Sequence, residues 1–411
     1  MHPKHLKIAD FTYDLPDEKI ATHPLENRDS SKLLLYKNGE ITETIFNHLP
    51  GYLPANSLMV FNNSKVIEAR LLFKKASGGM IEIFVLEPFQ MDVTSAMQKQ
   101  SAIECLCLVG GLGKWKNGHL QLKAENLLTD IADNEPLTLN AFFVEKIGEA
   151  CRIRFEWQPA TKNFAEVLHV LGKMPIPPYL RRAATEKDAV RYQTVYANAA
   201  GSVAAPTAGL HFSPAVINNL QEKNITTAYT TLHVGAGTFK PVKSETIAGH
   251  EMHAEYIDVD ITFIQLLIHY AQITPVGTTS MRTIESIYWM GLKTFLNPPI
   301  TLKALEISQW EIYDGLLEPA VSKKDALEAL VNWMKINQMQ RLIVQTQILI
   351  APGYQPKIAT GIITNFHQPN STLLLLIAAL VGDNWKKIYD YALTHSFRFL
   401  SYGDSSYIRF L

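Results

Sequence analysis

Two histidines, each in a loop of small residues, are the side chains of this sequence best suited to proton transfer. His211 lies in V-A-A-P-T-A-G-L-H-F, residues 203–212, and His233 lies in L-H-V-G-A-G-T-F, residues 232–239. Histidine changes its charge near neutral pH, which suits a general acid or base. Glycine and alanine let a backbone approach a ligand closely, and exposed loop amides bind polar groups. The two stretches are typical of an acid–base site, and equally of two tight turns with buried histidines.

Further polar residues occupy comparable loops. His253 lies in M-H-A-E-Y, and His367 lies in the polar loop of residues 365–369. The run T-T-S at residues 278–280 follows a predicted strand and precedes a predicted helix. Free amides and hydroxyls at such a helix N-terminus predict an anion site. Several titratable groups that converge on one cleft make an acid–base site, whereas a lone histidine is more often a satisfied core or surface group.

The thirteen histidines do not form a recognisable metal motif. His250 and His253 are three residues apart ahead of a predicted strand, whereas zincin chemistry needs histidines four apart on a helix. Cys105 and Cys107 alternate on a predicted strand, which favours buried thiols over a metal site. The G-A-G of residues 235–237 lacks the third glycine and the strand-first context of a dinucleotide site. We therefore expect no metal.

Composition indicates a folded protein of the cytosol. The chain has 411 residues, 47% of them hydrophobic and 19% charged, which is enough for two domains or for one large domain with an insertion. A net charge of −1 gives no global attraction to nucleic acid, so any such contact needs local basic patches. Three cysteines do not make a disulfide framework. The N-terminus lacks a signal-peptide core, and the longest apolar run, 373–381, is too short to span a bilayer.

The elements that must position these loops can be predicted locally. Ser213 and Pro214 are typical of a helix start, so a helix is expected after the first loop and a strand over 228–234 before the second. A buried strand over 273–277 and a helix over 282–290 flank the T-T-S run. Residues 291–340 are polar with weak periodicity and are interpreted as an elaboration.

Residues 66–155 have a different character. Six short β-like segments with Gly- or Asn-containing connections, and no clear helix, predict a small barrel or sandwich. Its loops carry Lys74, Lys75, Lys114 and Lys116. These lysines are either ordinary solvated side chains or a patch for phosphates.

Several long motifs together resemble a known enzyme family. They include the two histidine stretches and V-G-T-T-S-M-R-T-I-E-S, T-N-F-H-Q-P-N-S-T-L, P-L-E-N-R-D-S-S, V-F-N-N-S-K-V-I, M-P-I-P-P-Y and S-Y-G-D. In order, and over nearly the whole chain, they resemble S-adenosylmethionine:tRNA ribosyltransferase-isomerase of queuosine biosynthesis. The chain departs from the family pattern in a longer segment over 291–345, around residues 109–113, and at Ala351, where a tyrosine is common.

The resemblance implies a tRNA-modifying transferase. The enzyme would move the ribosyl part of S-adenosylmethionine onto 7-aminomethyl-7-deazaguanine at the tRNA wobble position, which gives epoxyqueuosine-tRNA, adenine and methionine. S-adenosylmethionine would be a consumed co-substrate, with no metal and no membrane involved, and we expect a cytoplasmic monomer. The implied fold is mixed α/β: a barrel-like large domain, residues 1–65 and 156–411, interrupted by a smaller all-β barrel-like domain, residues 66–155.

Within these motifs, we expect one cleft to hold the functional residues. The expected catalytic residues are His211, His233 and Arg282. The expected substrate-binding residues are Asn62, Thr207, Gly209, Gly235, Gly237, Thr238, His253, Glu255, Thr279, Ser280, Asn365 and His367.

Two other functions fit the same sequence less well. One is a tRNA-binding protein that keeps the fold without the transfer, which the retained histidine and small-residue motifs disfavour. The other is a nucleoside hydrolase, which the lack of metal and nucleophile-elbow signatures disfavours. Release of free adenine from S-adenosylmethionine in the presence of the tRNA distinguishes them.

Overall fold

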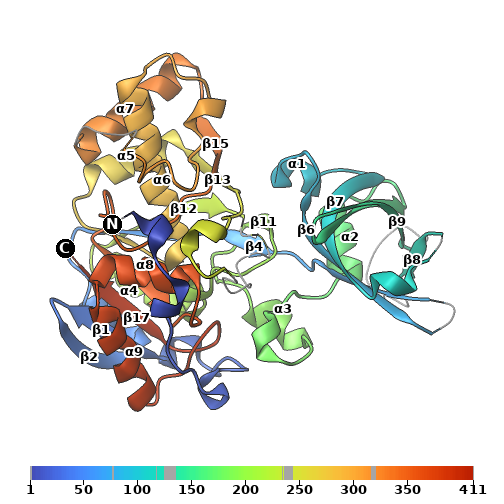
Figure 1. Ribbon diagram of the computed structural model, residues 1–411, viewed down its shortest axis with the longest axis horizontal. Coiled ribbons are helices and arrows are strands. Elements are labelled where there is room, and N and C mark those ends of the chain that lie inside the picture. The colour runs from blue at the N-terminus through green and yellow to red at the C-terminus, as the bar shows by residue number, and fades with distance from the viewer. Residues whose placement is uncertain are drawn as a thin grey trace.

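Two lobes of unequal size form the molecule. The computed structural model describes residues 2–75, 78–116, 118–124, 136–233, 235, 244–315 and 321–410. The larger lobe contains helices and strands and both ends of the chain, and the smaller lobe consists mainly of strands (Figure 1). The predicted mixed α/β class is therefore confirmed. Within the described residues, no helix is long and apolar enough to cross a membrane.

Two sheets form the framework of the large lobe. One has the order β14-β3-β12-β13-β15: Ile273–Pro275, Leu58–Asn62, Thr226–Leu232, Glu255–Asp260 and Arg341–Thr346. The other has the order β16-β17-β1-β2: Gly361–Asn365, Ser405–Arg409, Lys32–Lys37 and Glu40–Ile45. A parallel bridge between Val276 and Ile363 connects β14 to β16. This bridge joins the two sheets into one barrel-like wall.

Four neighbouring strands of this wall run in the same direction. β3 pairs in parallel with both β12 and β14, and the bridge to β16 is parallel too. All five residues of β3 and of β16 are buried, as expected for central strands covered on both faces. The carboxyl ends of the four strands therefore meet at one edge of the wall, where ligands bind in many α/β proteins.

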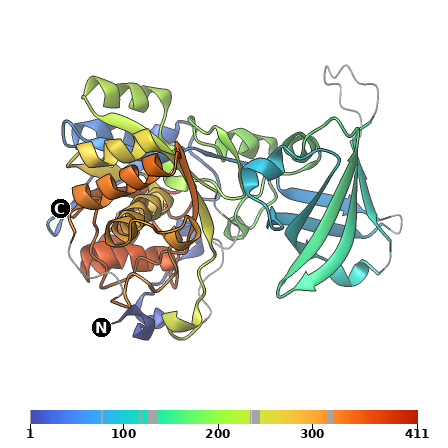
Figure 2. The ribbon, with the colours of Figure 1, turned by 90° about the horizontal axis from the view of Figure 1, so that it is seen from above.

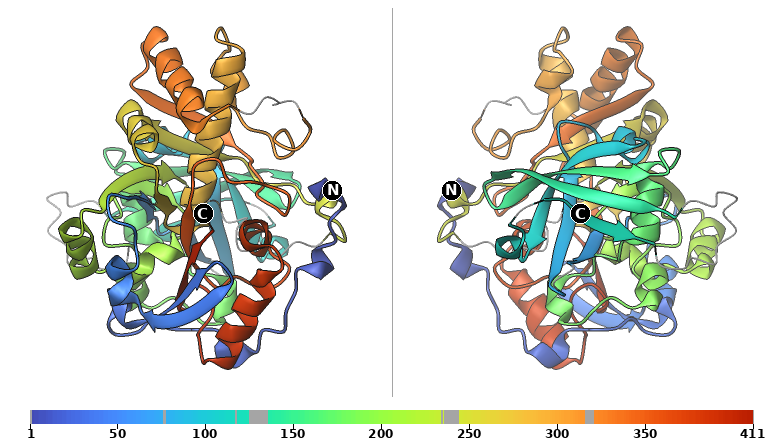
Figure 3. Two further views of the ribbon diagram at one scale, coloured as in Figure 1. Left: turned by 90° about the vertical axis from the view of Figure 1, so that its left-hand side faces the viewer. Right: turned by 90° about the vertical axis from the view of Figure 1, so that its right-hand side faces the viewer.

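Helices cover the wall of the large lobe. They are α4 (Pro214–Glu222), α5 (Ile261–His269), α6 (Gly277–Leu296), α7 (Lys323–Ile336), α8 (Thr372–Val381) and α9 (Asn384–Thr394). Helix α7 and helix α9 lie at opposite ends of the lobe (Figure 3). Short 3-10 turns complete the chain: η1 (Pro3–His5), η2 (Ile8–Asp10), η3 (Asp17–Lys19), η4 (Arg28–Ser30), η5 (Phe46–Gly51), η6 (Leu112–Lys114), η7 (Pro178–Leu180), η8 (Thr207–His211), η10 (Ile247–Gly249) and η11 (Lys303–Leu305).

The helix predicted over 282–290 is longer than expected at both ends. It begins at Gly277 and continues to Leu296, and α7 packs along it. A Cβ atom on Gly291 would lie 2.4 Å from the carbonyl oxygen of Ala326 in α7, so the glycine permits the close approach of the two helices. Much of the segment interpreted as an elaboration is therefore part of the large hydrophobic core.

The small lobe is one antiparallel sheet in the order β5-β6-β7-β10-β9-β8. Its strands are Arg70–Lys74, Met80–Pro88, Ala102–Gly110, Ala150–Gln158, Thr138–Ile147 and Leu120–Lys123, with the short helix α1 (Val93–Met97). The edge strands β5 and β8 approach each other, so the sheet is a nearly closed barrel (Figure 2). Cys105, Cys107 and Cys151 are buried as free thiols inside it.

Two chain crossings connect the lobes. β4 (Ser64–Val66) pairs in parallel with β11 (Ala199–Ser202) at the junction (Figure 1). On the return path lie α2 (Phe164–Leu171) and α3 (Glu186–Arg191). Phe164 and Leu168 of α2 belong to the hydrophobic cluster of the barrel, so the packing of the small lobe extends beyond residue 155. The domain boundary at residue 155 stays a prediction.

Candidate active site

Two adjoining hollows lie at one edge of the wall, and the first of them lies at the carboxyl ends of β14 and β16. The first encloses about 790 Å³ and the second about 710 Å³ of space open to solvent. Ser371 and Leu373 line both hollows, so the two share a wall at the start of α8.

The first hollow lies between η8, the N-terminus of α6 and the loop after β16. Four predicted site residues line it: Thr207, Thr279, Asn365 and His367. Gly277 begins α6 with φ of +86°, which favours glycine, and the side chain of the N-cap residue Val276 makes no capping hydrogen bond. The first-turn amides and the hydroxyls of Thr278 and Thr279 therefore supply hydrogen-bond donors beside the hollow. Ser280 is fully buried, and its hydroxyl has no partner among the described residues.

His367 is held rigidly on this hollow. Its Nε2 lies 2.8 Å from the Thr364 hydroxyl, its backbone N–H donates to the Tyr389 hydroxyl at 3.0 Å, and its carbonyl accepts from Tyr13. Burial lowers the pKa of His367 to about 3. The imidazole is therefore neutral at pH 7.

The second hollow contains a buried ion pair. Arg282 donates through Nη1 to Glu255 and through Nε to the carbonyl of Ile348 at 3.1 Å. Its remaining nitrogen, Nη2, is buried and has no partner among the described residues. Gly235 and His253 line the same hollow. A guanidinium with one uncommitted nitrogen can bind a carboxylate or another oxygen of a ligand.

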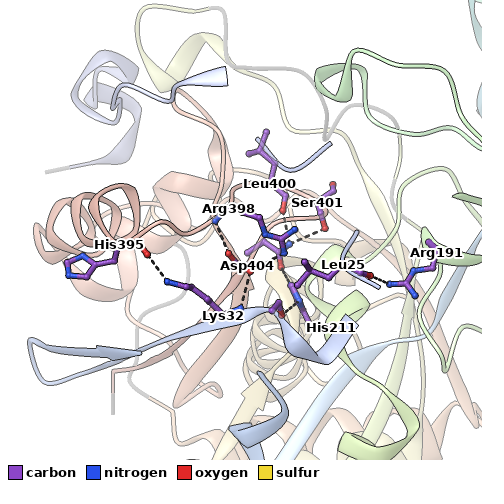
Figure 4. Close-up of polar contacts among 11 residues, drawn as sticks. Leu25, Lys32, Arg191, His211, His395, Arg398, Leu400, Ser401 and Asp404 are labelled. Carbon is purple, nitrogen blue, oxygen red and sulfur yellow. Dashed lines mark hydrogen bonds and ion pairs between the residues drawn. The ribbon is translucent and has the colours of Figure 1, made fainter. Parts of the chain in front are cut away.

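His211 lies near Leu400 and Ser401, two residues that line the first hollow (Figure 4). Its Nδ1 is 2.8 Å from the Ser31 hydroxyl, and its Nε2 is 3.1 Å from Oδ1 of Asn365. Asn365 in turn donates to the carbonyl of Leu400 at 2.9 Å. Burial lowers the pKa of His211 to about 4. His211 does not line the first hollow but contacts Asn365, which does, and it lines a third, smaller hollow.

His233 occupies a different place, against β11. A Cβ atom on Gly201 would lie 3.1 Å from its Nδ1, so the imidazole packs closely on that glycine. Neither ring nitrogen has a hydrogen-bond partner among the described residues, and burial lowers the pKa to about 4. His233 lines neither of the two adjoining hollows.

The motifs that form this site belong to one protein family. The profile of the "Queuosine biosynthesis protein" family matches residues 8–408. The chain is a member of this family. A crystal structure described as S-adenosylmethionine tRNA ribosyltransferase from Thermotoga maritima is similar at 25% sequence identity over 97% of this chain and 99% of that chain, with a TM-score of 0.45.

Two residues predicted to bind the ligand of this queuosine biosynthesis protein make close contacts within the protein. The side chain of Asn62 donates to the carbonyl of Leu232 at 3.0 Å and accepts from the amides of Leu232 and Ser64, which ties the end of β3 to the end of β12. A Cβ atom on Gly209 would lie 2.1 Å from the hydroxyl of Tyr196, so a larger residue would have to displace that side chain. Substrate contacts by these two residues stay predictions, and Gly237 and Thr238 lie outside the described residues.

The sequence did not single out three residues on the hollows of this family member. Ser371 caps α8 and also lines both hollows. Tyr179 and Ser401 bond through their hydroxyls at 2.5 Å and line the first hollow. Their motifs, M-P-I-P-P-Y and S-Y-G-D, were the available signal. In the described part of the chain, no group of three or more His, Cys, Asp or Glu could hold a metal ion.

Proposed function

We propose that this queuosine biosynthesis protein transfers and isomerises the ribosyl part of S-adenosylmethionine onto tRNA. The acceptor is 7-aminomethyl-7-deazaguanine at the wobble position, and the products are epoxyqueuosine-tRNA, adenine and methionine. The observation that carries the proposal is the pair of adjoining hollows, because the family motifs form both of them.

The charge state of the site suits this co-substrate. S-adenosylmethionine carries a sulfonium cation, and a protonated imidazole beside it would be repelled. His367 stays neutral because burial lowers its pKa to about 3. A neutral ring can face the sulfonium and still donate or accept one hydrogen bond.

The two hollows offer places for different parts of the co-substrate. The uncommitted Nη2 of Arg282 suits the carboxylate of the methionine part. The α6 amides with Thr278 and Thr279 suit the ribose oxygens in the first hollow. The reaction requires removal of a proton next to the sulfonium and departure of adenine, and methionine leaves as the epoxide closes. In this proposal His367 faces the co-substrate as the proton-transfer group, and the catalytic roles predicted from the sequence for His211, His233 and Arg282 stay untested.

The small lobe is proposed to hold the tRNA. Nζ of Lys75 donates to the carbonyl of Lys114 at 2.5 Å, so the loops after β5 and β7 lie together. Lys74, Lys114 and Lys116 are exposed around this contact. Clustered lysines attract phosphates without reading sequence. We further propose that the protein acts in the cytoplasm as a monomer.

One assay tests the proposed function. The protein is incubated with S-adenosylmethionine and tRNA that carries the aminomethyl base, and free adenine is measured. We expect adenine release that depends on both substrates. A tRNA-binding protein without transferase activity releases no adenine, and a nucleoside hydrolase releases adenine without the tRNA.

A further inference from the structure

A third hollow, lined by arginines, lies next to the first one. It is formed by the loop containing η4, the end of α3, η8 and the turn before β17. Arg28, Arg191 and Arg398 line it together with His211. Figure 4 shows Arg191 and Arg398 on either side of His211 and Ser401.

The positive charge in this hollow is only partly balanced. Arg398 pairs with Asp404 at 3.1 Å and is neutralised. Arg28 donates to the backbone carbonyl of Gln193 at 3.1 Å, and Arg191 donates to the backbone carbonyls of Glu26 and Leu25 at 3.0 and 2.5 Å. Carbonyl groups accept hydrogen bonds but bring no negative charge.

Two nearby groups, Asp29 and His211, do not neutralise the positive charge inside the hollow. Asp29 is the carboxylate beside Arg28, and it accepts a 2.5 Å hydrogen bond from the Ser213 hydroxyl. It lies on the same 3-10 turn as Arg28 and is not among the residues that line the hollow. His211 is neutral at pH 7 and adds no charge. Burial, and next the charge of Arg191, lower the pKa of Arg28, as expected for two guanidinium groups close together. A bound anion would relieve this repulsion.

The position of the hollow narrows the choice of anion. Ser401 lines both this hollow and the first one, and the bonded pair His211 and Asn365 lies between the two. An anion held by Arg28 and Arg191 is therefore separated from the first hollow by a single layer of side chains. The wobble base must enter the first hollow under the proposed function, and a phosphodiester flanks every nucleotide of a tRNA.

We propose that Arg28 and Arg191 bind a backbone phosphate of the tRNA next to the wobble nucleotide. The inference rests on the proposed function, since that function brings the wobble nucleotide to the first hollow. Guanidinium groups match the geometry of phosphate oxygens with two parallel hydrogen bonds. The contact orients the anticodon loop and does not read the base. The carboxylate of S-adenosylmethionine has related chemistry, and the test must distinguish the two sources.

The variants Arg28→Gln and Arg191→Gln test the site in the full-length protein. Binding of tRNA that carries the aminomethyl base is measured by fluorescence anisotropy at several salt concentrations, and binding of S-adenosylmethionine by calorimetry. We expect each variant to bind tRNA roughly tenfold more weakly, with the slope of log K against log salt reduced in magnitude by about 1. Binding of S-adenosylmethionine stays unchanged.

Lys335→Gln is the matched control. It removes one positive charge from an exposed position on α7, at the end of the large lobe opposite β1 and β2 (Figure 1). We expect this variant to bind tRNA like the wild type. If Arg191→Gln loosens the loop it holds and fails to fold, Arg28→Lys replaces it. That variant keeps the charge, loses the bidentate geometry, and should bind tRNA with an affinity between those of the wild type and Arg28→Gln.

Two results overturn the site. The first is an unchanged tRNA affinity and salt slope in folded Arg28→Gln. The second is loss of S-adenosylmethionine binding in that variant with tRNA binding intact, which would assign the hollow to the carboxylate of S-adenosylmethionine. Adenine release by the wild type is scored separately. If the wild type releases adenine while Arg28→Gln binds tRNA normally, only the phosphate site fails. If Arg28→Gln loses tRNA affinity while the wild type releases no adenine, a contact of Arg28 with a tRNA phosphate stands, but the proposed function fails and with it the placement of that phosphate next to the wobble nucleotide.

Discussion

Three histidines whose pKa is lowered by burial make the stability of this protein depend on pH. Burial lowers the pKa of His211 and His233 to about 4 and that of His367 to about 3, against about 6.5 in an unfolded chain. Between these values the unfolded state binds more protons, so stability is fully present above about pH 6.5 and decreases as pH falls towards 4. Each histidine contributes a slope of about 1.4 kcal/mol per pH unit within that window.

Urea unfolding between about pH 5 and pH 7.5 measures this slope. We expect the free energy of unfolding to decrease steadily on the acid side. His211→Asn should reduce the slope of the unfolding free energy against pH by the contribution of one histidine, independently of its effect on stability at pH 7. A free energy of unfolding that does not change over this range would show that the rings are not held neutral.

The positions of His367 and His211 give different expectations for their substitution. His367 lines the first hollow, whereas His211 does not, and its Nε2 contacts Asn365, which lines that hollow. His367→Gln should lower single-turnover adenine release by roughly a hundredfold, the usual effect of removing a positioned proton-transfer group. His211→Asn should lower it less, with S-adenosylmethionine affinity retained in both variants. A larger loss for His211→Asn would assign direct proton transfer to His211.

At the scale of elements, the contact between α6 and α7 depends on one glycine. The helix propensity of alanine is higher than that of glycine by about 1 kcal/mol. If position 291 were exposed, Gly291→Ala would therefore stabilise the protein. The alanine Cβ atom would instead lie 2.4 Å from the backbone oxygen of Ala326, and a backbone atom cannot move aside as a flexible side chain can. We expect the clash to exceed the gain in propensity and to destabilise the protein by about 1–3 kcal/mol. Thermal unfolding measures the change, and a stabilised variant would contradict the packing described for α6.

The same glycine explains one limit of prediction from sequence. Local signals gave the start of α4 correctly, since the Ser213 hydroxyl accepts from the Val216 amide at 3.2 Å and Pro214 occupies the first turn. The end of α6 was placed too early, because its continuation through Gly291 depends on packing against α7 and not on a local signal. The bridge between Val276 and Ile363 joins residues far apart in sequence and could not be predicted from either stretch alone.

At the candidate site, too, the sequence indicated many of the residues but not the directions of their side chains. The sequence selected residues that the structure brings to the two hollows, such as Thr207, Thr279 and His367 in the first and Arg282 in the second. It did not show that Asn365 separates His211 from the first hollow, because this depends on where side chains point.

At the scale of the whole molecule, the small lobe is expected to contribute tRNA affinity and not chemistry. Replacing Lys74, Lys114 and Lys116 together by glutamine removes three exposed charges near the Lys75–Lys114 contact. We expect weaker tRNA binding with a smaller salt dependence, and unchanged affinity for S-adenosylmethionine, as measured by anisotropy and calorimetry. Unaltered tRNA affinity in this folded variant would contradict a role of these lysines in binding tRNA.

The fate of each part of S-adenosylmethionine tests the central proposal most directly. The co-substrate is labelled with one isotope in the ribose and another in the methyl group, and is incubated with the protein and tRNA that carries the aminomethyl base. The proposed ribosyl transfer predicts that the ribose label appears in the tRNA, while the methyl label appears in free methionine and adenine is released in equal amount. Methyl label in the tRNA, or adenine release with no ribose label in the tRNA, would contradict it.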